Sequence, residues 1–195
     1  MKMDFETALL FLKERISVHL ALRPLVIAID GRAASGKTTF AERLSNEIDV
    51  TVIHTDDFFR PRDSFGKLKI SEYDGNFDIE RFRDEVVNGI ASGKPFVYGR
   101  YDCKIGKIVE KICCDKASCF VVEGSYSQNP KLGDYADIKL FFDIDKQTQR
   151  ERIISRNGKN AFQNFCTMWI PAEERYFEKY NIVSNCDIVI STKVG

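Results

Sequence analysis

The length and composition of the chain suit one α/β domain with a sizeable core. It has 195 residues, 44% of them hydrophobic, and we treat residues 1–195 as a single domain with a helical extension at residues 1–23. Its 29 basic and 29 acidic residues cancel, which argues against a nucleic-acid polymer or an acidic membrane surface as partner. Charged residues at 13–15 interrupt the short apolar stretch before them, so we expect no secretory signal and no membrane span, and we predict a cytoplasmic protein.

The first third of the chain alternates between helix and strand patterns. Residues 4–21 carry apolar side chains at steps of three and four, which predicts an amphipathic helix that ends before Arg23 and Pro24. Residues 25–29 form a continuous apolar run, typical of a strand buried on both faces of a parallel sheet. We then expect, in chain order, a helix at residues 37–47, a strand at residues 50–53, and a polar loop that contains Pro61, Gly66 and Gly75.

The remainder of the chain continues the alternation. Residues 78–91 have helical spacing, and residues 95–112 alternate enough to predict a short hairpin or an extended excursion over the sheet. The later elements that we expect are strands at residues 119–122, 138–144 and 188–190 and helices at residues 146–156 and 172–180. Strands and helices that alternate in this way predict an α/β fold: a mostly parallel five-stranded sheet with helices on both faces and an N-terminal helix.

Residues 31–38, Gly-Arg-Ala-Ala-Ser-Gly-Lys-Thr, match the phosphate-loop pattern GxxxxGK[ST], between a predicted strand and a predicted helix. Glycines let the backbone curl so that its N–H groups face phosphate oxygens, and the helix N-terminus favours negative charge. The pattern therefore predicts a P-loop NTPase fold that binds ATP with Mg²⁺. We expect Lys37 to bridge the β- and γ-phosphates and Thr38 to bind Mg²⁺. The expected nucleotide-binding residues are Gly31, Ala33, Ala34, Ser35, Gly36, Lys37, Thr38 and Thr39, of which Thr39 is either a phosphate contact or an ordinary helix residue.

Residues 54–61, His-Thr-Asp-Asp-Phe-Phe-Arg-Pro, follow the second predicted strand, so Asp56 is expected at the carboxyl edge of the sheet, where ligands bind in such folds. Here the sequence resembles the uridine kinase-like group of P-loop small-molecule kinases, which includes uridine kinases, nicotinamide riboside kinases and phosphoribulokinases. The resemblance covers about residues 25–191 and implies a nucleoside- or nucleotide-kinase-like fold. Its further pieces are Asn76-Phe77-Asp78, Tyr101-Asp102, Val121-Val122-Glu123-Gly124, a helix with Arg150, Arg152 and Arg156, and a segment with Trp169, Pro171, Glu174 and Tyr176.

The resemblance implies catalytic roles for residues at the strand ends and on the arginine helix. Asp56 is expected to act as general base toward the acceptor hydroxyl, with Asp57 as the rival, and Glu123 to help hold Mg²⁺. Arg152 and Arg156 are four residues apart, so they share a helix face and are expected to clamp the transferring phosphoryl group. Alternatively, Asp56 is an N-cap or turn residue, Glu123 is a solvated acid at a strand end, and the arginines form a solvated basic helix face.

For the acceptor, the resemblance implies contacts from Asp56, Phe59, Asp78 and Tyr101, although aromatic residues at such spacings also serve as core. Uridine kinases carry a histidine shortly after the Tyr-Asp pair, whereas the residues that follow the pair here, Cys103-Lys104-Ile105-Gly106, include none, which disfavours uridine itself. We therefore expect transfer of the γ-phosphate of ATP to a hydroxyl of a small metabolite, a nucleoside or riboside. The alternatives are a nucleotide-binding switch or sensor without an acceptor, and a nucleoside monophosphate kinase. The first helix offers a contact face for a homo-oligomer.

Overall fold

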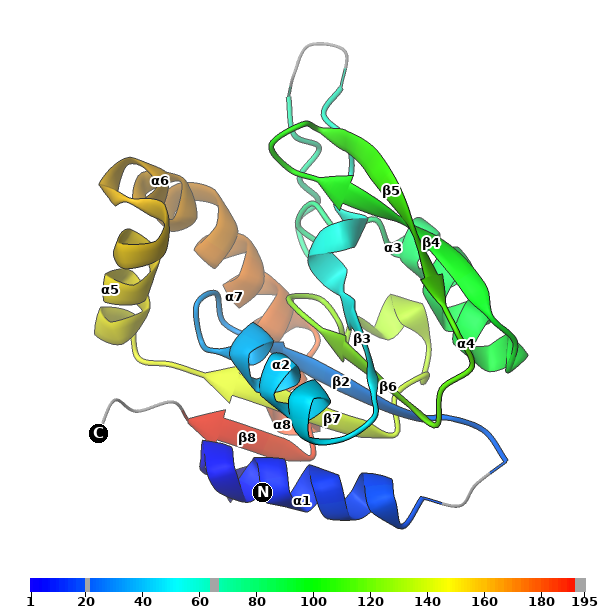
Figure 1. The fold of residues 1–195 in the computed structure, drawn as a ribbon. Coiled ribbons are helices and arrows are strands. Elements are labelled where there is room, and N and C mark those ends of the chain that lie inside the picture. Colours follow the sequence, from blue (N-terminus) through cyan, green and yellow to red (C-terminus); the bar gives the residue numbers. More distant parts are fainter. Residues whose placement is uncertain (20–21, 64–66, 192–195) are drawn as a thin grey trace.

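The structure is a computed structural model that describes residues 1–19, 22–63 and 67–191. Within these residues the chain forms a six-stranded sheet with the strand order β1-β8-β7-β2-β6-β3, and every pair of neighbours is parallel (Figure 1). The strands are β1 (Lys2–Met3), β2 (Leu25–Gly31), β3 (Thr51–His54), β6 (Cys119–Glu123), β7 (Ile138–Asp143) and β8 (Ile188–Ser191). The predicted class, a parallel α/β sheet with an N-terminal helix, is confirmed.

One strand was not predicted. β1 contributes only Lys2 and Met3, which pair with Val189 and Ile190 at the sheet edge, so the described part of the chain has six strands in its main sheet rather than the five expected. Two residues are too few to show an alternating or continuous apolar pattern. The five expected strands all appear, with ends that differ from the prediction by one or two residues.

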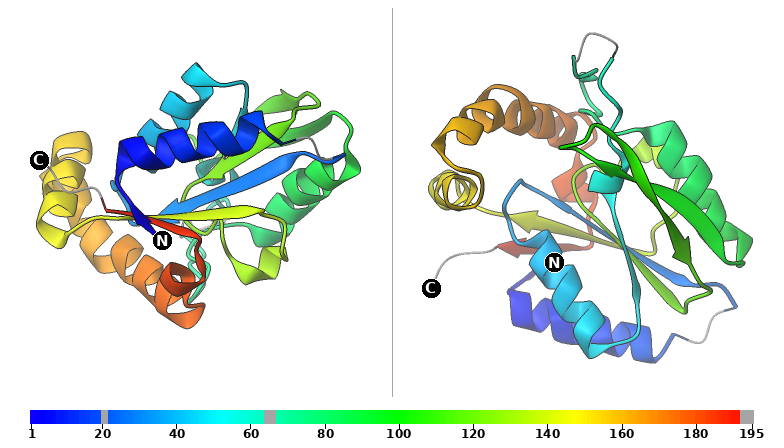
Figure 2. Two further views of the ribbon diagram at one scale, coloured as in Figure 1. Left: turned by 90° about the horizontal axis from the view of Figure 1, so that it is seen from below. Right: turned by 45° about the horizontal axis from the view of Figure 1, so that its top comes forward.

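Helices cover both faces of the sheet (Figure 2). They are α1 (Phe5–Ser17), α2 (Lys37–Glu47), α3 (Ile79–Phe82), α4 (Asn88–Ser92), α5 (Lys146–Asn157), α6 (Lys159–Asn164), α7 (Ile170–Lys179) and α8 (Ile182–Asn185). A π-helical turn joins α3 to α4 within the predicted helix at residues 78–91, and α6 was missed because it buries no side chain and so shows no apolar period. α1 begins at the N-cap Asp4 and ends at Ser17, earlier than expected, while residue 21 and Gly66 lie outside the described residues.

The two faces of the sheet carry separate hydrophobic cores. On one face, α1 and α2 pack Leu12 and Leu44 against Ile27 of β2. On the other face, Phe82 and Tyr176 belong to a second core. This core contacts the sheet through the strand side chains that alternate with those of the first face. This arrangement follows from the period of two along a strand, because a strand buried on both faces needs an apolar side chain at every position.

An antiparallel hairpin of β4 (Phe96–Asp102) and β5 (Lys107–Cys114) stands apart from the main sheet, as the alternation at residues 95–112 predicts. Its register shifts between Arg100 and Tyr101, and Asp102 accepts N–H bonds from Lys104 and Ile105 in the turn. Figure 1 shows this hairpin on one side of the segment between β2 and α2, with α5 and α6 on the other side. The loops between these parts form the candidate site.

Candidate functional site

The segment between β2 and α2 curls as the glycine pattern predicts. Gly31 has φ of 141°, and a Cβ there would lie 2.3 Å from the carbonyl oxygen of Phe142, so only glycine allows β7 to pass this closely. Gly36 has φ of 103° and is the N-cap of α2, to which it gives no side-chain hydrogen bond. Gly36 therefore offers no side-chain cap to the first-turn N–H groups of α2, which suits a helix N-terminus that binds an anion.

Lys37, the first residue of α2, is buried beneath this loop. Its Nζ atom donates hydrogen bonds to the carbonyl oxygens of Gly31 at 2.7 Å and Arg32 at 2.9 Å. These two acceptors hold the ammonium group inside the curl rather than in bulk solvent. A buried ammonium surrounded by backbone N–H groups makes a strong site for phosphate oxygens.

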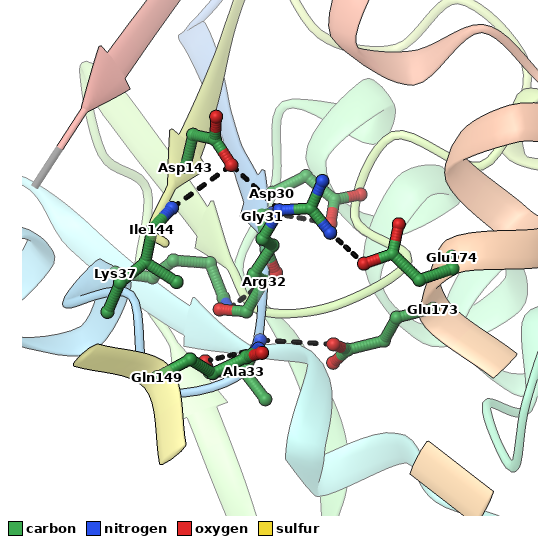
Figure 3. A network of polar contacts seen from close by, with 10 residues as sticks. All are labelled: Asp30, Gly31, Arg32, Ala33, Lys37, Asp143, Ile144, Gln149, Glu173 and Glu174. Atoms are coloured by element: carbon green, nitrogen blue, oxygen red, sulfur yellow. Dashed lines mark hydrogen bonds and ion pairs between the residues drawn. The ribbon is translucent and has the colours of Figure 1, made fainter. Parts of the chain in front are cut away.

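Three of the predicted nucleotide contacts have N–H groups that are already bonded within the protein, and one of these, the N–H of Ser35, donates to the carbonyl of Arg32 at 3.2 Å. The N–H of Gly31 donates to Oδ1 of Asp30 at 2.7 Å, and the N–H of Ala33 donates to Oε2 of Glu173 at 3.0 Å. The carbonyl of Ala33 also accepts from Nε2 of Gln149 at 3.1 Å (Figure 3). Gly31 and Ala33 thus shape the loop, and their amides are not available to phosphate. Of the expected residues, Gly31 does not line the cavity of the site, and those that do are Ala33, Ala34, Ser35, Gly36, Lys37, Thr38 and Thr39.

The side-chain hydroxyl of Ser35 bears on whether the loop fits a triphosphate. Its Oγ atom is fully buried and has no hydrogen-bond partner within the described part of the chain. Buried hydroxyl groups nearly always have a partner, so this one calls for a polar ligand. Phosphate oxygens would satisfy it, and the donor set of the loop therefore fits a nucleotide.

Helix α7 supports the phosphate loop through Glu173, a residue that the sequence analysis did not identify. Besides accepting from Ala33, the buried carboxylate of Glu173 accepts from Oγ of Ser125 at 2.7 Å, and burial raises its pKa. Glu173 lies three residues before the buried Tyr176 on the same helix face, and an acid on an otherwise apolar face is the signal that would have found it. Arg32 completes the link, because its guanidinium bonds both Asp143 and Glu174 (Figure 3).

Thr38 and Glu123 come together as expected for a magnesium site. Oγ1 of Thr38 lies 3.2 and 3.3 Å from the two carboxylate oxygens of Glu123. Nδ1 of His54 lies 2.5 Å from the same carboxylate, and this hydrogen bond raises the pKa of His54. No cluster of three or more His, Cys, Asp or Glu side chains suited to a metal occurs among the described residues. Mg²⁺ does not need one, since one carboxylate and one hydroxyl suffice when phosphates and water supply the other oxygens.

The two adjacent aspartates that follow β3 differ in position. Asp56 is exposed toward the cavity that it lines, and partial desolvation by the surrounding protein together with the nearby Glu123 carboxylate raises its pKa. Asp57 is not among the lining residues, and its Oδ2 atom accepts a 3.3 Å bond from the hydroxyl of Tyr98. The geometry favours Asp56 over Asp57 as the group that meets an acceptor.

The residues predicted for acceptor binding are only partly brought together. Phe59 and Tyr101 line the cavity, whereas Asp78 does not. Asp78 is the N-cap of α3, where its side chain accepts from the N–H of Arg81 at 3.2 Å. The capping role accounts for its sequence position, so the structure does not favour an acceptor contact. Asn76, from the Asn-Phe-Asp segment of the resemblance, lines this region, and its lining residues that no sequence pattern indicated are Arg62, Leu68 and Tyr126.

The arginine helix α5 faces the loop through two of its three arginines. Nη1 of Arg152 donates to the carbonyl of Ala34 at 3.2 Å, and Arg156 bonds the side chain of Asn157 through Nε at 2.9 Å. Both arginines line the cavity, whereas Arg150 lies over the ring of Phe162, 5.7 Å from its centroid. The i, i+4 spacing thus places Arg152 and Arg156 toward the loop, as predicted from helix geometry.

The lining residues of the phosphate loop, the strand ends and α5 border one cavity of about 850 Å³, a size that suits a nucleotide with a small acceptor. A parallel sheet, a curled phosphate loop after its first long strand and an arginine-bearing helix opposite the loop are the P-loop NTPase fold, in the arrangement typical of P-loop kinases. No helix of residues 1–19, 22–63 or 67–191 is long and apolar enough for a membrane crossing.

Comparison with known proteins finds similar sequences among the uridine kinases and uridine kinase-like proteins. No protein-family model matches the chain. It is 28% identical to uridine kinase-like protein 5 of Arabidopsis thaliana over 172 residues, which are 81% of this chain and 36% of that protein. It is 26% identical to uridine-cytidine kinase B of Dictyostelium discoideum over 69% of this chain and 58% of that protein, so the chain spans only part of these relatives. The match to the uridine kinase of Ureaplasma parvum serovar 3 is 28% identical and covers 75% of this chain and 76% of that protein.

Solved structures show the same fold. A possible uridine kinase from Bacillus stearothermophilus superimposes with a TM-score of 0.72 at 21% identity, over 96% of this chain and all of that one. D-glycerate 3-kinase from Cryptococcus neoformans superimposes with a TM-score of 0.60 at 15% identity, over 91% of this chain and 87% of that one. The chain is therefore similar to the uridine kinase-like P-loop kinases, and these similarities support a small-molecule kinase.

Proposed function

We propose that the chain is an ATP-dependent phosphotransferase that moves the γ-phosphate to a hydroxyl group of a nucleoside or riboside. One observation carries the proposal: Asp56 and Tyr101 line the same cavity as the phosphate loop. A switch or sensor needs the loop but has no use for a carboxylate and an aromatic pocket beside it. The names of the relatives, uridine kinase and uridine-cytidine kinase, agree with a nucleoside acceptor.

The proposed mechanism assigns positioning and charge to the loop and to α5. The first-turn amides of α2 and the ammonium of Lys37 bind the β- and γ-phosphates, and Arg152 and Arg156 stabilise the charge on the group in transfer. Asp56 orients the acceptor hydroxyl and accepts its proton as the new P–O bond forms and the bond to ADP breaks. Its raised pKa brings it closer to the working pH of a general base.

Thr38 and Glu123 are the residues that would hold Mg²⁺, since their oxygen atoms lie side by side at the loop. When bound, the ion supplies positive charge to the β- and γ-phosphate oxygens. The hydrogen bond from His54 orients the Glu123 carboxylate, as partners of metal-binding groups commonly do.

The acceptor pocket is lined by Phe59, Asn76, Tyr101 and Cys103. The aromatic rings of Phe59 and Tyr101 suit contact with a base or another flat ring. The thiol of Cys103 is only a weak hydrogen-bond donor, so it recognises the polar edge of a pyrimidine poorly. We therefore propose a riboside whose ring is held mainly by contact, and uridine is disfavoured relative to other ring systems. This specificity follows from the lack of a histidine shortly after Tyr101 and Asp102, where Cys103 lines the cavity instead.

A screen of acceptors tests the proposal. ADP release is measured with Mg²⁺-ATP and a panel of nucleosides, nicotinamide riboside and non-ribose alcohols, with the rate without acceptor as background. We expect one riboside to raise ADP release well above background, with a phosphorylated product visible by mass spectrometry, and Lys37→Ala to remove both signals. ATP hydrolysis that no acceptor stimulates would instead indicate a switch or sensor, and stimulation by nucleoside monophosphates alone would indicate a nucleotide kinase.

A further inference from the structure

Phe5 is an aromatic residue of the candidate site that the catalytic scheme leaves without a role. It is the first residue of α1, in the N-terminal extension, and it lines the same cavity as the phosphate loop. Its ring meets the ring of Phe40 edge-on, with centroids 4.9 Å apart, and the guanidinium of Arg43 lies over it at 5.7 Å. Phe5 is nevertheless only half-buried, so part of the ring stays open.

The strand order places Phe5 at one end of the cavity. Asp56 follows β3 and Phe5 follows β1, and these strands form the two opposite edges of the described sheet, with the phosphate loop after β2 between them. Because every strand pair is parallel, all three segments lie at the same carboxyl edge. The cavity thus runs along this edge from the acceptor carboxylate, past the loop, to Phe5.

This order sets the direction of a bound nucleotide. If Asp56 meets the acceptor, the γ-phosphate must face the β3 side of the loop, and the nucleoside must leave the loop toward the β1 side. Arg156 and Asn157 at the end of α5 line the cavity as well. Among the described residues, Phe5 is the lining aromatic side chain of the β1 edge; Phe165 and Trp169 come from the segment between α6 and α7.

We propose that Phe5 packs against the nucleobase of the phosphate donor and so acts as a binding residue for ATP. The proposal rests on the proposed function, because it takes the loop to hold a triphosphate. Every base has an apolar π-face, and an aromatic side chain held by neighbouring rings presents contact area at little cost in conformational freedom. The role also explains why an apolar ring is left half-exposed at the start of α1, where burial of Leu9 and Leu12 already anchors the helix.

The test separates contact with the base from contact with the phosphates. Trp169 is the single tryptophan and lines the cavity, so its fluorescence reports binding of ATP and of tripolyphosphate, which has no base. We expect Phe5→Leu to weaken ATP binding at least about fivefold and to change tripolyphosphate binding less than about twofold. Phe5→Tyr should retain ATP binding. Phe11→Leu is the matched control, because Phe11 lies on the same helix, is half-buried and does not line the cavity.

Other outcomes overturn the proposal. Equal losses for both ligands in Phe5→Leu would mean that Phe5 only supports the loop through Phe40, and no loss for either ligand would mean that the base lies elsewhere. A measurement on the unmodified chain needs no variant: photo-crosslinking with an azido-adenine triphosphate should label the peptide that contains Phe5, and exclusive labelling of the segment with Phe165 and Trp169 would contradict it. If the unmodified chain binds neither ATP nor tripolyphosphate, the proposed function itself fails.

Discussion

The hydroxyl of Tyr176 donates a 2.7 Å hydrogen bond to Oδ2 of Asp30 and so joins α7 to the end of β2. Asp30 is fully buried, and its carboxylate also accepts from the N–H groups of Gly31 at 2.7 Å and Gln128 at 3.1 Å. One buried carboxylate therefore holds the start of the phosphate loop, a neighbouring loop and a helix in one arrangement. The cost of burying its charge is offset only while all three donors are present.

Tyr176→Phe should lower stability in a pH-dependent manner. Burial raises the pKa of Asp30 above its ordinary value of 3.8, so the native chain binds this proton more tightly than the unfolded chain does. Stability from this group therefore falls as pH rises from about 3.8 through the raised native value. Loss of the Tyr176 donor further disfavours the ionised form, so we expect a deficit of about 1–3 kcal/mol at neutral pH that shrinks in acid.

Denaturant unfolding of the unmodified chain and Tyr176→Phe, at steps from pH 7.5 to pH 4.5, measures this deficit. Tyr73→Phe is the control, because the Tyr73 hydroxyl is bonded to the exposed Glu72 rather than to a buried acid. A deficit that grows toward low pH would contradict the assignment of the effect to Asp30.

Glu173→Ala should loosen the phosphate loop. The change leaves the N–H of Ala33 and the hydroxyl of Ser125 without their acceptor, and an unpaired buried donor costs about 1–3 kcal/mol. We expect kcat/KM with ATP to fall by about tenfold, while Glu178→Ala, an exposed acid on the same helix, should have no effect. Steady-state kinetics measure both. Normal kinetics in Glu173→Ala would show that the Glu173 carboxylate does not support the loop.

Lys37→Ala should nearly abolish phosphoryl transfer. Removal of a preorganised charge at the transferring group costs about 10²–10³ in rate, and the two loop carbonyls that now bond Lys37 would lose their donor. Single-turnover assays with radiolabelled ATP measure the transfer, and a melting curve checks that the variant still folds. Near-normal transfer in a folded variant would remove the loop from the mechanism.

Asp56→Asn should separate chemistry from binding. An amide cannot accept the acceptor proton, so we expect transfer to fall about 10² or more while ATP affinity changes only a few-fold. Asp57→Asn is the neighbouring control, since Asp57 bonds Tyr98 and is not among the cavity-lining residues. If Asp57→Asn lost transfer and Asp56→Asn kept it, the base would be Asp57, and collapse of ATP binding in Asp56→Asn would indicate a structural or metal-binding role.

Phosphoryl transfer should require Mg²⁺, and Glu123 should contribute to binding the ion. We expect excess EDTA to stop the reaction and added Mg²⁺ to restore it, because the phosphate charge must be neutralised. Glu123→Gln keeps the size of the side chain but removes its charge, so the Mg²⁺ concentration for half-maximal rate should rise about tenfold or more. A Mg²⁺ titration of both proteins measures the shift. Full activity in EDTA would contradict the metal site.

Much of the fold could be predicted because its signals lie between near neighbours in the chain. The apolar run at residues 25–29 and the helical spacing at residues 37–47 appear as β2 and α2 in the structure. β1 and α6 escaped prediction, since two strand residues and a helix that buries no side chain leave no periodic pattern.

The candidate site likewise has one part that neighbouring residues in the chain encode and another part that only the fold assembles. The sequence by itself determined the phosphate loop, because the glycines, Lys37 and Thr38 that curl around phosphates must be contiguous in the chain. Only the tertiary structure decided that Glu173, 140 positions after Ala33, accepts the N–H of that residue, that Asp56 rather than Asp57 lines the cavity, and that Phe5 lines the same cavity. These relationships depend on the order of the parallel strands and the packing of α7, and no short stretch of sequence encodes either of them.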